Sequence, residues 1–168
     1  MQRSDFWETG LYSKQYYEGE CVTREMITHV ENVLGYKLPA SYIELLCERN
    51  GGIVHRRCCL TNQRTSWSDN HIQIHAILGI GQTPYSVFNT AFWIAEWGYP
   101  DIGIAICDCP SAGHDMVFLD YRTCGLDGEP QVVHVDQARN YQITILADNF
   151  SEFLDKLMTE AEMDSIEQ

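Results

Sequence analysis

The sequence has few basic residues and no long hydrophobic run. Lysine and arginine total 11 of its 168 residues against 24 aspartates and glutamates, which gives a formal charge of -13 at pH 7. A surface with this charge repels phosphate, so direct binding of nucleic acid is disfavoured. No apolar stretch reaches the roughly 18 residues that span a bilayer, so no membrane segment is predicted. The acidic balance favours a basic protein partner, or it serves solubility alone.

Internal repeats and low-complexity tracts are also absent. A hydrophobic content of 45% is that of a globular protein, not of a disordered one. Because 168 residues fit one domain, we predict a single domain over residues 1–168 with its core at about residues 23–158. The stretch 159–168 is acidic and poor in large apolar residues, so we expect it to fray.

The opening Met1-Gln-Arg-Ser-Asp is unlike a signal peptide, and the cysteine count of seven is odd. Both features favour a reduced compartment, in which thiols act mostly as small buried apolar groups. We therefore expect the protein to be cytoplasmic.

Two helices are predicted near the start. Thr23 can cap the first, whose apolar residues recur at helical spacing until Gly35 supplies a left-handed stop. Pro39 suits the first turn of the second helix, which ends at Asn50-Gly51-Gly52. The polar segment from His55 to Asn70 is predicted to be a long surface loop.

Alternating apolar residues predict one half-buried strand from Ile72 to Leu78. A helix is expected from Ser86 to Trp97, and a last helix begins at Asn149 with a capping box. The apolar face of the Ser86–Trp97 helix comprises Phe88, Ala91, Phe92 and Ala95. Three more strands are predicted at residues 102–107, 116–120 and 131–136, joined by short links rich in turn residues. These elements predict an α+β fold, with an antiparallel sheet covered on one side by helices.

The segment Leu34-Gly35-Tyr36-Lys37-Leu38-Pro39, followed by a helix and Asn50-Gly51-Gly52, resembles the N-terminal hallmark of the SUKH superfamily. Three later segments and the closing helix are also similar to it: residues 96–103, 111–121 and 128–136. The resemblance spans about Thr23 to Met158. It implies an α+β domain with a mostly antiparallel, strongly curved sheet flanked by helices.

Many bacterial members of this superfamily are immunity proteins that neutralise toxins, often nucleases or deaminases. A yeast branch regulates cell-wall assembly through protein contacts. The resemblance therefore implies a non-catalytic binding protein without a cofactor. Its expected partner is a basic toxin domain, which it would block by steric and electrostatic occlusion. The alternative is an intracellular scaffold or regulator that binds endogenous partners.

Acidic residues in predicted loops and at strand ends are the candidate contacts for such a partner, with one tryptophan as an aromatic anchor. The candidate partner-binding residues are Trp67, Asp69, Asp108, Asp115, Asp120, Asp127 and Glu129. Two other tryptophans, Trp93 and Trp97, share a helix face and are expected to cover the sheet.

A weaker alternative is a small zinc or thiol protein. It would use two thiols and an imidazole near one predicted turn, those of Cys107, Cys109 and His114. Zinc sites usually have C-x₂₋₄-C spacing and a second ligand pair elsewhere. A thiol nucleophile needs a stabilised thiolate, whereas the neighbouring Asp108 and Asp115 would raise the thiol pKa. We therefore predict no catalytic residue and no metal ligand.

Overall fold

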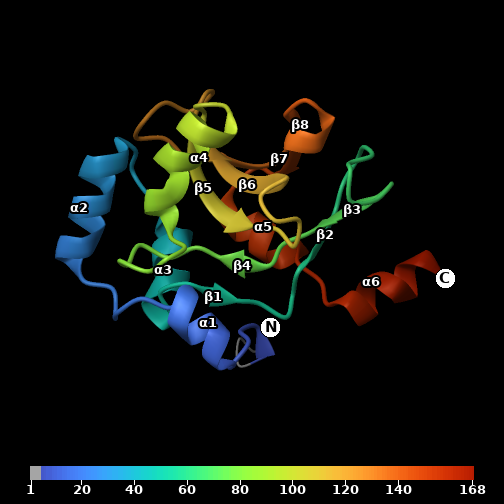
Figure 1. Ribbon diagram of the computed structural model, residues 1–168, viewed down its shortest axis with the longest axis horizontal. Helices are drawn as coiled ribbons and strands as arrows, with labels where there is room; N and C mark the ends of the chain where they lie inside the picture. Colours follow the sequence, from blue (N-terminus) through green and yellow to red (C-terminus); the bar gives the residue numbers. More distant parts are fainter. Residues whose placement is uncertain (1–4) are drawn as a thin grey trace.

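The computed structural model describes residues 5–168. Most of the opening segment that is unlike a signal peptide, residues 1–4, lies outside the described residues. Its main sheet has six strands in the order β1-β4-β5-β6-β7-β8, and every neighbouring pair is antiparallel (Figure 1). The strands are β1 (Gly52–Ile53), β4 (Ala76–Ile77), β5 (Gly103–Asp108), β6 (Asp115–Asp120), β7 (Gln131–Asp136) and β8 (Gln142–Ala147). The predicted α+β class with an antiparallel sheet is confirmed.

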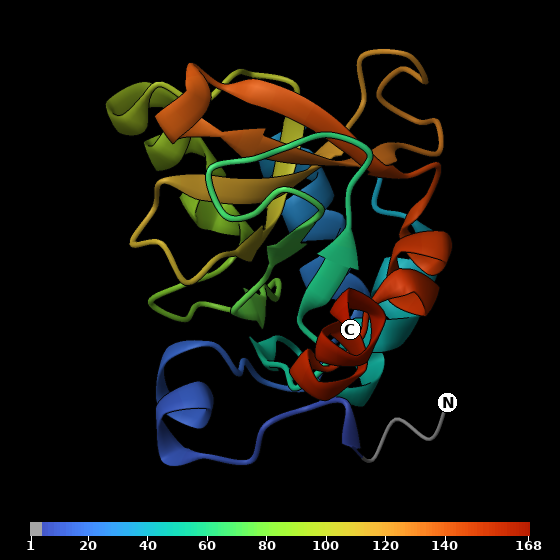
Figure 2. The ribbon, with the colours of Figure 1, turned by 90° about the vertical axis from the view of Figure 1, so that its right-hand side faces the viewer.

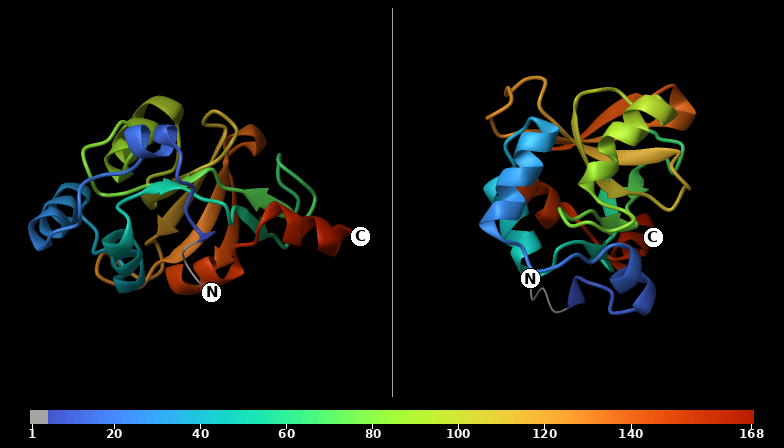
Figure 3. Two further views of the ribbon diagram at one scale, coloured as in Figure 1. Left: turned by 90° about the horizontal axis from the view of Figure 1, so that it is seen from below. Right: turned by 60° about the vertical axis from the view of Figure 1, so that its left-hand side comes forward.

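Six α-helices surround this sheet in the described part of the chain. They are α1 (Leu11–Tyr16), α2 (Arg24–Leu34), α3 (Ala40–Glu48), α4 (Thr90–Trp97), α5 (Phe150–Lys156) and α6 (Glu160–Glu167). Over residues 5–168, none of them has the length and apolar content to cross a membrane. Figure 3 shows α1 and α4 on one side of the sheet, and α3 and α5 on the other. The prediction of helices on one side only is therefore wrong, and β6 is buried along its whole length because both its faces are covered.

The predicted helix ends at Thr23, Gly35 and Asn149 follow from local chemistry and are confirmed. The Thr23 hydroxyl accepts a hydrogen bond from the Met26 amide, and Gly35 closes α2 with φ of 82°. Pro39 lies directly before α3, not in its first turn as predicted. The Asn149 side chain accepts from the Glu152 amide at the start of α5. The Glu152 carboxylate accepts from the Asp148 amide instead of the Asn149 amide, so only half of the predicted capping box forms.

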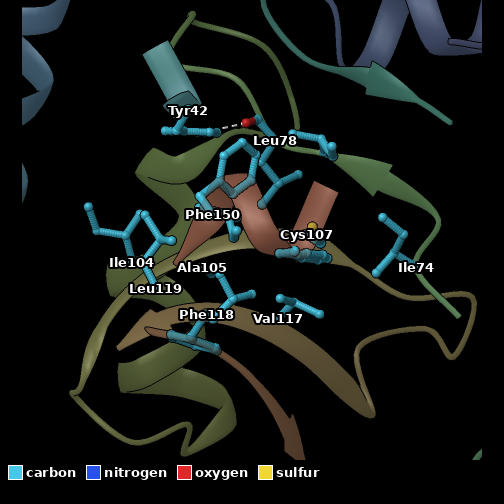
Figure 4. Packing of buried hydrophobic residues seen from close by; sticks show 14 of the residues in the cluster. Tyr42, Ile74, Leu78, Ile104, Ala105, Cys107, Val117, Phe118, Leu119 and Phe150 are labelled. Carbon is cyan, nitrogen blue, oxygen red and sulfur yellow. Dashed lines mark hydrogen bonds between the residues drawn. The ribbon is translucent and has the colours of Figure 1, made fainter. Parts of the chain in front are cut away.

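The core between α3, α5 and the sheet is built around Tyr42, which is fully buried. Its ring meets Phe150 edge to face at 5.1 Å. Its hydroxyl donates to the Leu78 carbonyl, as Figure 4 shows. A buried hydroxyl without a partner is costly, so this bond fixes α3 against the chain beyond β4.

The segment from residue 55 to 78 differs from its prediction. It contains a separate two-stranded hairpin, in which β2 (Cys58–Leu60) pairs with β3 (His71–Gln73). The predicted strand Ile72–Leu78 is therefore divided: its start belongs to this hairpin, and β4 belongs to the main sheet. Alternation shows which residues are buried but not which strand they pair with, and for this reason the break was missed.

The helix ending at Trp97 buries a different face from the predicted one. A short 3-10 turn (Val87–Asn89) precedes α4, and Val87, Thr90 and Trp93 are the buried residues. The Thr90 hydroxyl donates to the Val87 carbonyl and accepts from the Ala105 amide of β5, which turns this side of the helix to the sheet. Phe92, predicted to face the core, is consequently 50% exposed.

The acidic end of the chain forms a helix where we expected fraying. Thr159 and Glu162 make a reciprocal capping box at the start of α6, and Met163 is buried. The Glu162 carboxylate also accepts two hydrogen bonds from the Arg56 guanidinium. Figure 2 shows α6 in front of the domain, near β2. A long-range ion pair that periodicity cannot reveal thus holds this segment in place.

Candidate functional site

A pocket of about 430 Å³ opens between α1, α4 and the turn that joins β5 to β6. Five aromatic side chains contribute to its lining: Tyr12, Tyr17, Tyr85, Trp93 and Trp97. None of the described residues that line it is a lysine or an arginine. We call this site the aromatic pocket.

The rings of the aromatic pocket are held by contacts with one another. Tyr17 stacks on Tyr85 with ring centroids 5.2 Å apart, and Trp93 lies 6.1 Å from Trp97. The Trp97 ring covers Gly113, where φ is +90° and a Cβ atom would collide with the indole. Only glycine suits both the left-handed backbone and this close approach.

Asp108, at the end of β5, is the carboxylate of the aromatic pocket. Its Oδ2 accepts from the Tyr17 hydroxyl at 2.6 Å, and its Oδ1 accepts from the Ala76 amide at 3.1 Å. Burial raises the pKa of Asp108 to about 6, although both hydrogen bonds oppose this shift. Burial lowers the pKa of the neighbouring His75, which lines the pocket as a neutral imidazole at pH 7.

A buried polar group lies directly behind this wall. Ligand atoms of Cys109, Asp115 and His134 all lie within 4.8 Å of one another. His134 Nε2 is 2.7 Å from Asp115 Oδ2, and because a carboxylate only accepts, the imidazole nitrogen donates. Burial, and then the charge of Asp115, raise the pKa of the Cys109 thiol well above its ordinary value. His134 Nδ1 and Asp115 Oδ1 are buried without a hydrogen-bond partner among the described residues, so the polar atoms of this group are only partly satisfied. The raised pKa of the Cys109 thiol opposes formation of a reactive thiolate there.

The three residues of the zinc or thiol alternative do not come together. Within residues 5–168, the cluster of metal-ligating side chains contains Cys109 but neither Cys107 nor His114. Cys107 is buried and His114 is exposed on the turn. Burial also raises the pKa of Cys107 well above its ordinary value, which opposes formation of a thiolate.

The structure separates the predicted partner-binding residues instead of gathering them on one face. Trp67 and Asp69 are exposed at the tip of the β2–β3 hairpin, far to the right in Figure 1. Asp127 and Glu129 are exposed in the loop between β6 and β7. For these four residues, contact with a partner stays a prediction.

The other three predicted aspartates have partners inside the protein. Asp115 is buried against His134. The Asp120 side chain is also buried and accepts hydrogen bonds from Arg122, which lowers its pKa even though burial itself raises it. Asp108 is partly exposed and lines the aromatic pocket. Asp115 and Asp120 therefore lack the exposure that a contact with a partner requires.

Sequence reasoning missed the aromatic pocket because its wall comes from four separate segments. Tyr17 is buried against the domain, whereas Tyr12 is 53% exposed. Trp93 covers the sheet as predicted, whereas Trp97 is 36% exposed at the pocket rim. The four-residue spacing of Trp93 and Trp97 was the sequence signal that could have indicated an aromatic surface here.

A comparison with known protein families shows to which family the chain is related. The family model SUKH_6, described as SMI1-KNR4 cell-wall, matches residues 24–154. The chain belongs to the SUKH family. Its family supports a toxin-immunity or cell-wall-related binding role, and SUKH members are generally non-catalytic. No curated protein matched the chain. The α1 wall of the aromatic pocket, with Tyr12 and Tyr17, lies before the residues that match this SUKH model.

Proposed function

We propose that this SUKH protein is a non-catalytic immunity protein that acts in the cytoplasm. It binds a cognate protein toxin, a nuclease or deaminase domain, and blocks the basic surface with which that toxin contacts nucleic acid. The surface that makes this contact is the aromatic pocket and its rim.

The observation that carries this proposal is the group of open aromatic side chains around the pocket. Tyr12, Phe92 and Trp97 are all partly exposed, and Phe92 contacts Trp97 with ring centroids 5.7 Å apart. Tryptophan and tyrosine dominate the binding energy of protein interfaces because each buries a large rigid surface. Exposed aromatic clusters of this kind are uncommon on proteins that bind nothing.

The charge of the chain supports a basic partner. A formal charge of -13 attracts a cationic surface over several ångströms. Steering of this kind raises association rates by roughly 10–1000-fold at low salt, and the gain falls steeply as salt is added. We therefore expect the association rate with the toxin to depend strongly on ionic strength.

The test is co-expression with the C-terminal domain encoded by the gene beside this one. Rescue of growth and a stable complex in gel filtration would support the proposal. Failure of both would overturn it, and purification with an endogenous partner would favour a scaffold or regulator instead.

Two tryptophans of similar exposure provide a matched pair of variants. Trp97 is 36% exposed at the aromatic pocket and Trp67 is 39% exposed on the hairpin. Trp97→Ala should weaken toxin binding by about 30-fold or more, the effect of losing an interface hot spot. Trp67→Ala should leave affinity nearly unchanged. The reverse order would place the interface on the hairpin.

A further inference from the structure

We propose that the aromatic pocket is a receptor for one arginine side chain of the protein partner, with the guanidinium between the aromatic rings and against the carboxylate of Asp108. The assignment of this arginine to a protein partner rests on the proposed function. The choice of arginine rests on the chemistry of the pocket.

The pocket is built for a cation. Aromatic faces attract cations through the ring quadrupole, and tryptophan does so most strongly. Trp93, Trp97, Tyr17 and Tyr85 all line this one volume, and Trp97 is the tryptophan among them with the larger exposed surface. No lysine or arginine among the described residues lines that volume. A cation entering it therefore meets attractive groups and displaces no internal one.

Asp108 supplies the matching negative charge. Its hydrogen-bond donors are all neutral: the Tyr17 hydroxyl, the Ala76 amide and the backbone amide of Asp108 itself. A carboxylate has about four lone-pair positions, so about one remains for a ligand. The carboxylate is partly buried, and none of the donors in these hydrogen bonds is a cation. Burial of an unpaired charge costs free energy, and a bound cation reduces that cost.

Arginine suits this arrangement better than lysine. The guanidinium is flat, stacks on aromatic rings and presents a fork of donors to a carboxylate, whereas the ammonium group is compact and strongly hydrated. The open volume of about 430 Å³ easily holds one side chain of this size. An acidic protein that covers a nucleic-acid-binding surface would meet many arginines there, since arginine is the residue of choice for phosphate recognition.

The experiment is an NMR titration of the full-length protein with N-acetyl-arginine methylamide. The indole N–H signals of Trp93 and Trp97 report on the pocket, and the indole of Trp67 reports on the distant hairpin. Two matched probes are N-acetyl-citrulline methylamide, which has nearly the same shape without the charge, and N-acetyl-lysine methylamide.

The proposal expects saturable shifts at Trp93 and Trp97 with the arginine probe, and none at Trp67. The citrulline probe should bind about tenfold more weakly or worse, and the lysine probe should also be weaker. Equal binding of citrulline would show that the pocket does not select charge, and equal binding of lysine would show that it does not select a guanidinium. Either result, or shifts spread evenly over the acidic surface, would overturn the proposal.

Asp108→Asn keeps the size of the side chain and should weaken the arginine probe about tenfold, with little effect on citrulline. Asp69→Asn is the control, because it removes one charge at the hairpin. If both variants weaken the probe equally, only net charge matters and the pocket assignment is wrong. Arginine binding without growth rescue would overturn toxin neutralisation alone, whereas growth rescue without arginine binding would overturn the pocket assignment alone.

Discussion

The aromatic pocket and the region where the β2–β3 hairpin meets α6 share the same ingredients. Each has one partly exposed tryptophan and at least one carboxylate. At the hairpin and α6, arginines already pair with the acids: Arg56 with Glu162, Arg57 with Glu160 and Arg64 with Asp69. In the aromatic pocket, the hydrogen bonds to Asp108 come from a hydroxyl and from backbone amides, all of them neutral donors.

The difference teaches that acids beside an aromatic ring do not by themselves identify a binding surface. Where internal cations pair with the acids, a partner gains little from them, and the pairs serve to fasten one element to another. Where the acid has neutral donors only, a basic partner can still gain from pairing with it. On this criterion, the pocket is the better candidate than the hairpin on which Trp67 lies.

The largest expected effect is at the buried polar group behind the pocket. His134→Ala leaves the Asp115 carboxylate buried without its partner and should lower the free energy of unfolding by about 3–5 kcal/mol, measured by urea denaturation. His71→Ala is the control at the hairpin, where the imidazole is partly exposed, and should cost less than about 1 kcal/mol. Replacing Asp115 and His134 together by leucine should cost less than His134→Ala. A larger cost for the double variant would show that the pair is stabilising in itself.

A smaller effect is expected at the other region. Met163 is the buried residue of α6, and Met163→Ala should cost about 2–3 kcal/mol by removal of a buried side chain. Because α6 is remote from the pocket, the affinity for the arginine probe should not change. A parallel loss of probe binding would mean that the two regions are coupled.

The pH dependence of stability should also distinguish the regions. The folded-state pKa of Asp108 is raised to about 6 from an ordinary value of 3.8, so the folded protein binds this proton more tightly than the unfolded chain does. The stability contributed by the neutral acid is present below about pH 4 and is lost as pH rises through about 6, an effect on the order of 3 kcal/mol. Asp108→Asn should flatten this part of the curve of unfolding free energy against pH, whereas Asp69→Asn should not.

The smallest effect is expected for a single ion pair. Arg56→Ala removes the bidentate bond to Glu162 and the hydrogen bond from Arg56 Nε to the Leu157 carbonyl. It should cost about 1–2 kcal/mol in unfolding free energy, because both charged groups are partly exposed. Amide hydrogen exchange should rise in α6 and stay unchanged around the pocket. Faster exchange at the pocket would contradict the separation of the two regions.

The prediction of the fold depended on whether the signal was local. Helix caps at Thr23 and Asn149, and the glycine after α2, are decided by residues within a few positions of one another, and these boundaries were predicted correctly. The sequence pattern does not predict the strand β8, and it predicts a loop for the residues of β2. Both form by pairing with a strand whose position the local sequence does not reveal.

The candidate site illustrates the same limit. Asp108 was selected from the sequence as an acid near a strand end, and it does line the pocket. Asp115, seven positions later, was selected for the same reason and is buried against His134. The two aspartates are alike in sequence context, and only the sheet register decides which one reaches solvent.

The sequence by itself determined the acidic charge, the limits of α2, the start of α5, the antiparallel α+β class and the likeness to the SUKH family, since all of these are properties of composition or of neighbouring residues. The tertiary structure alone decided that Trp97 lies at the rim of a pocket, that Asp108 faces its interior and that the acidic end forms α6. Each of these outcomes depends on contacts between residues far apart in the chain, and burial, pairing and charge compensation are set by such contacts.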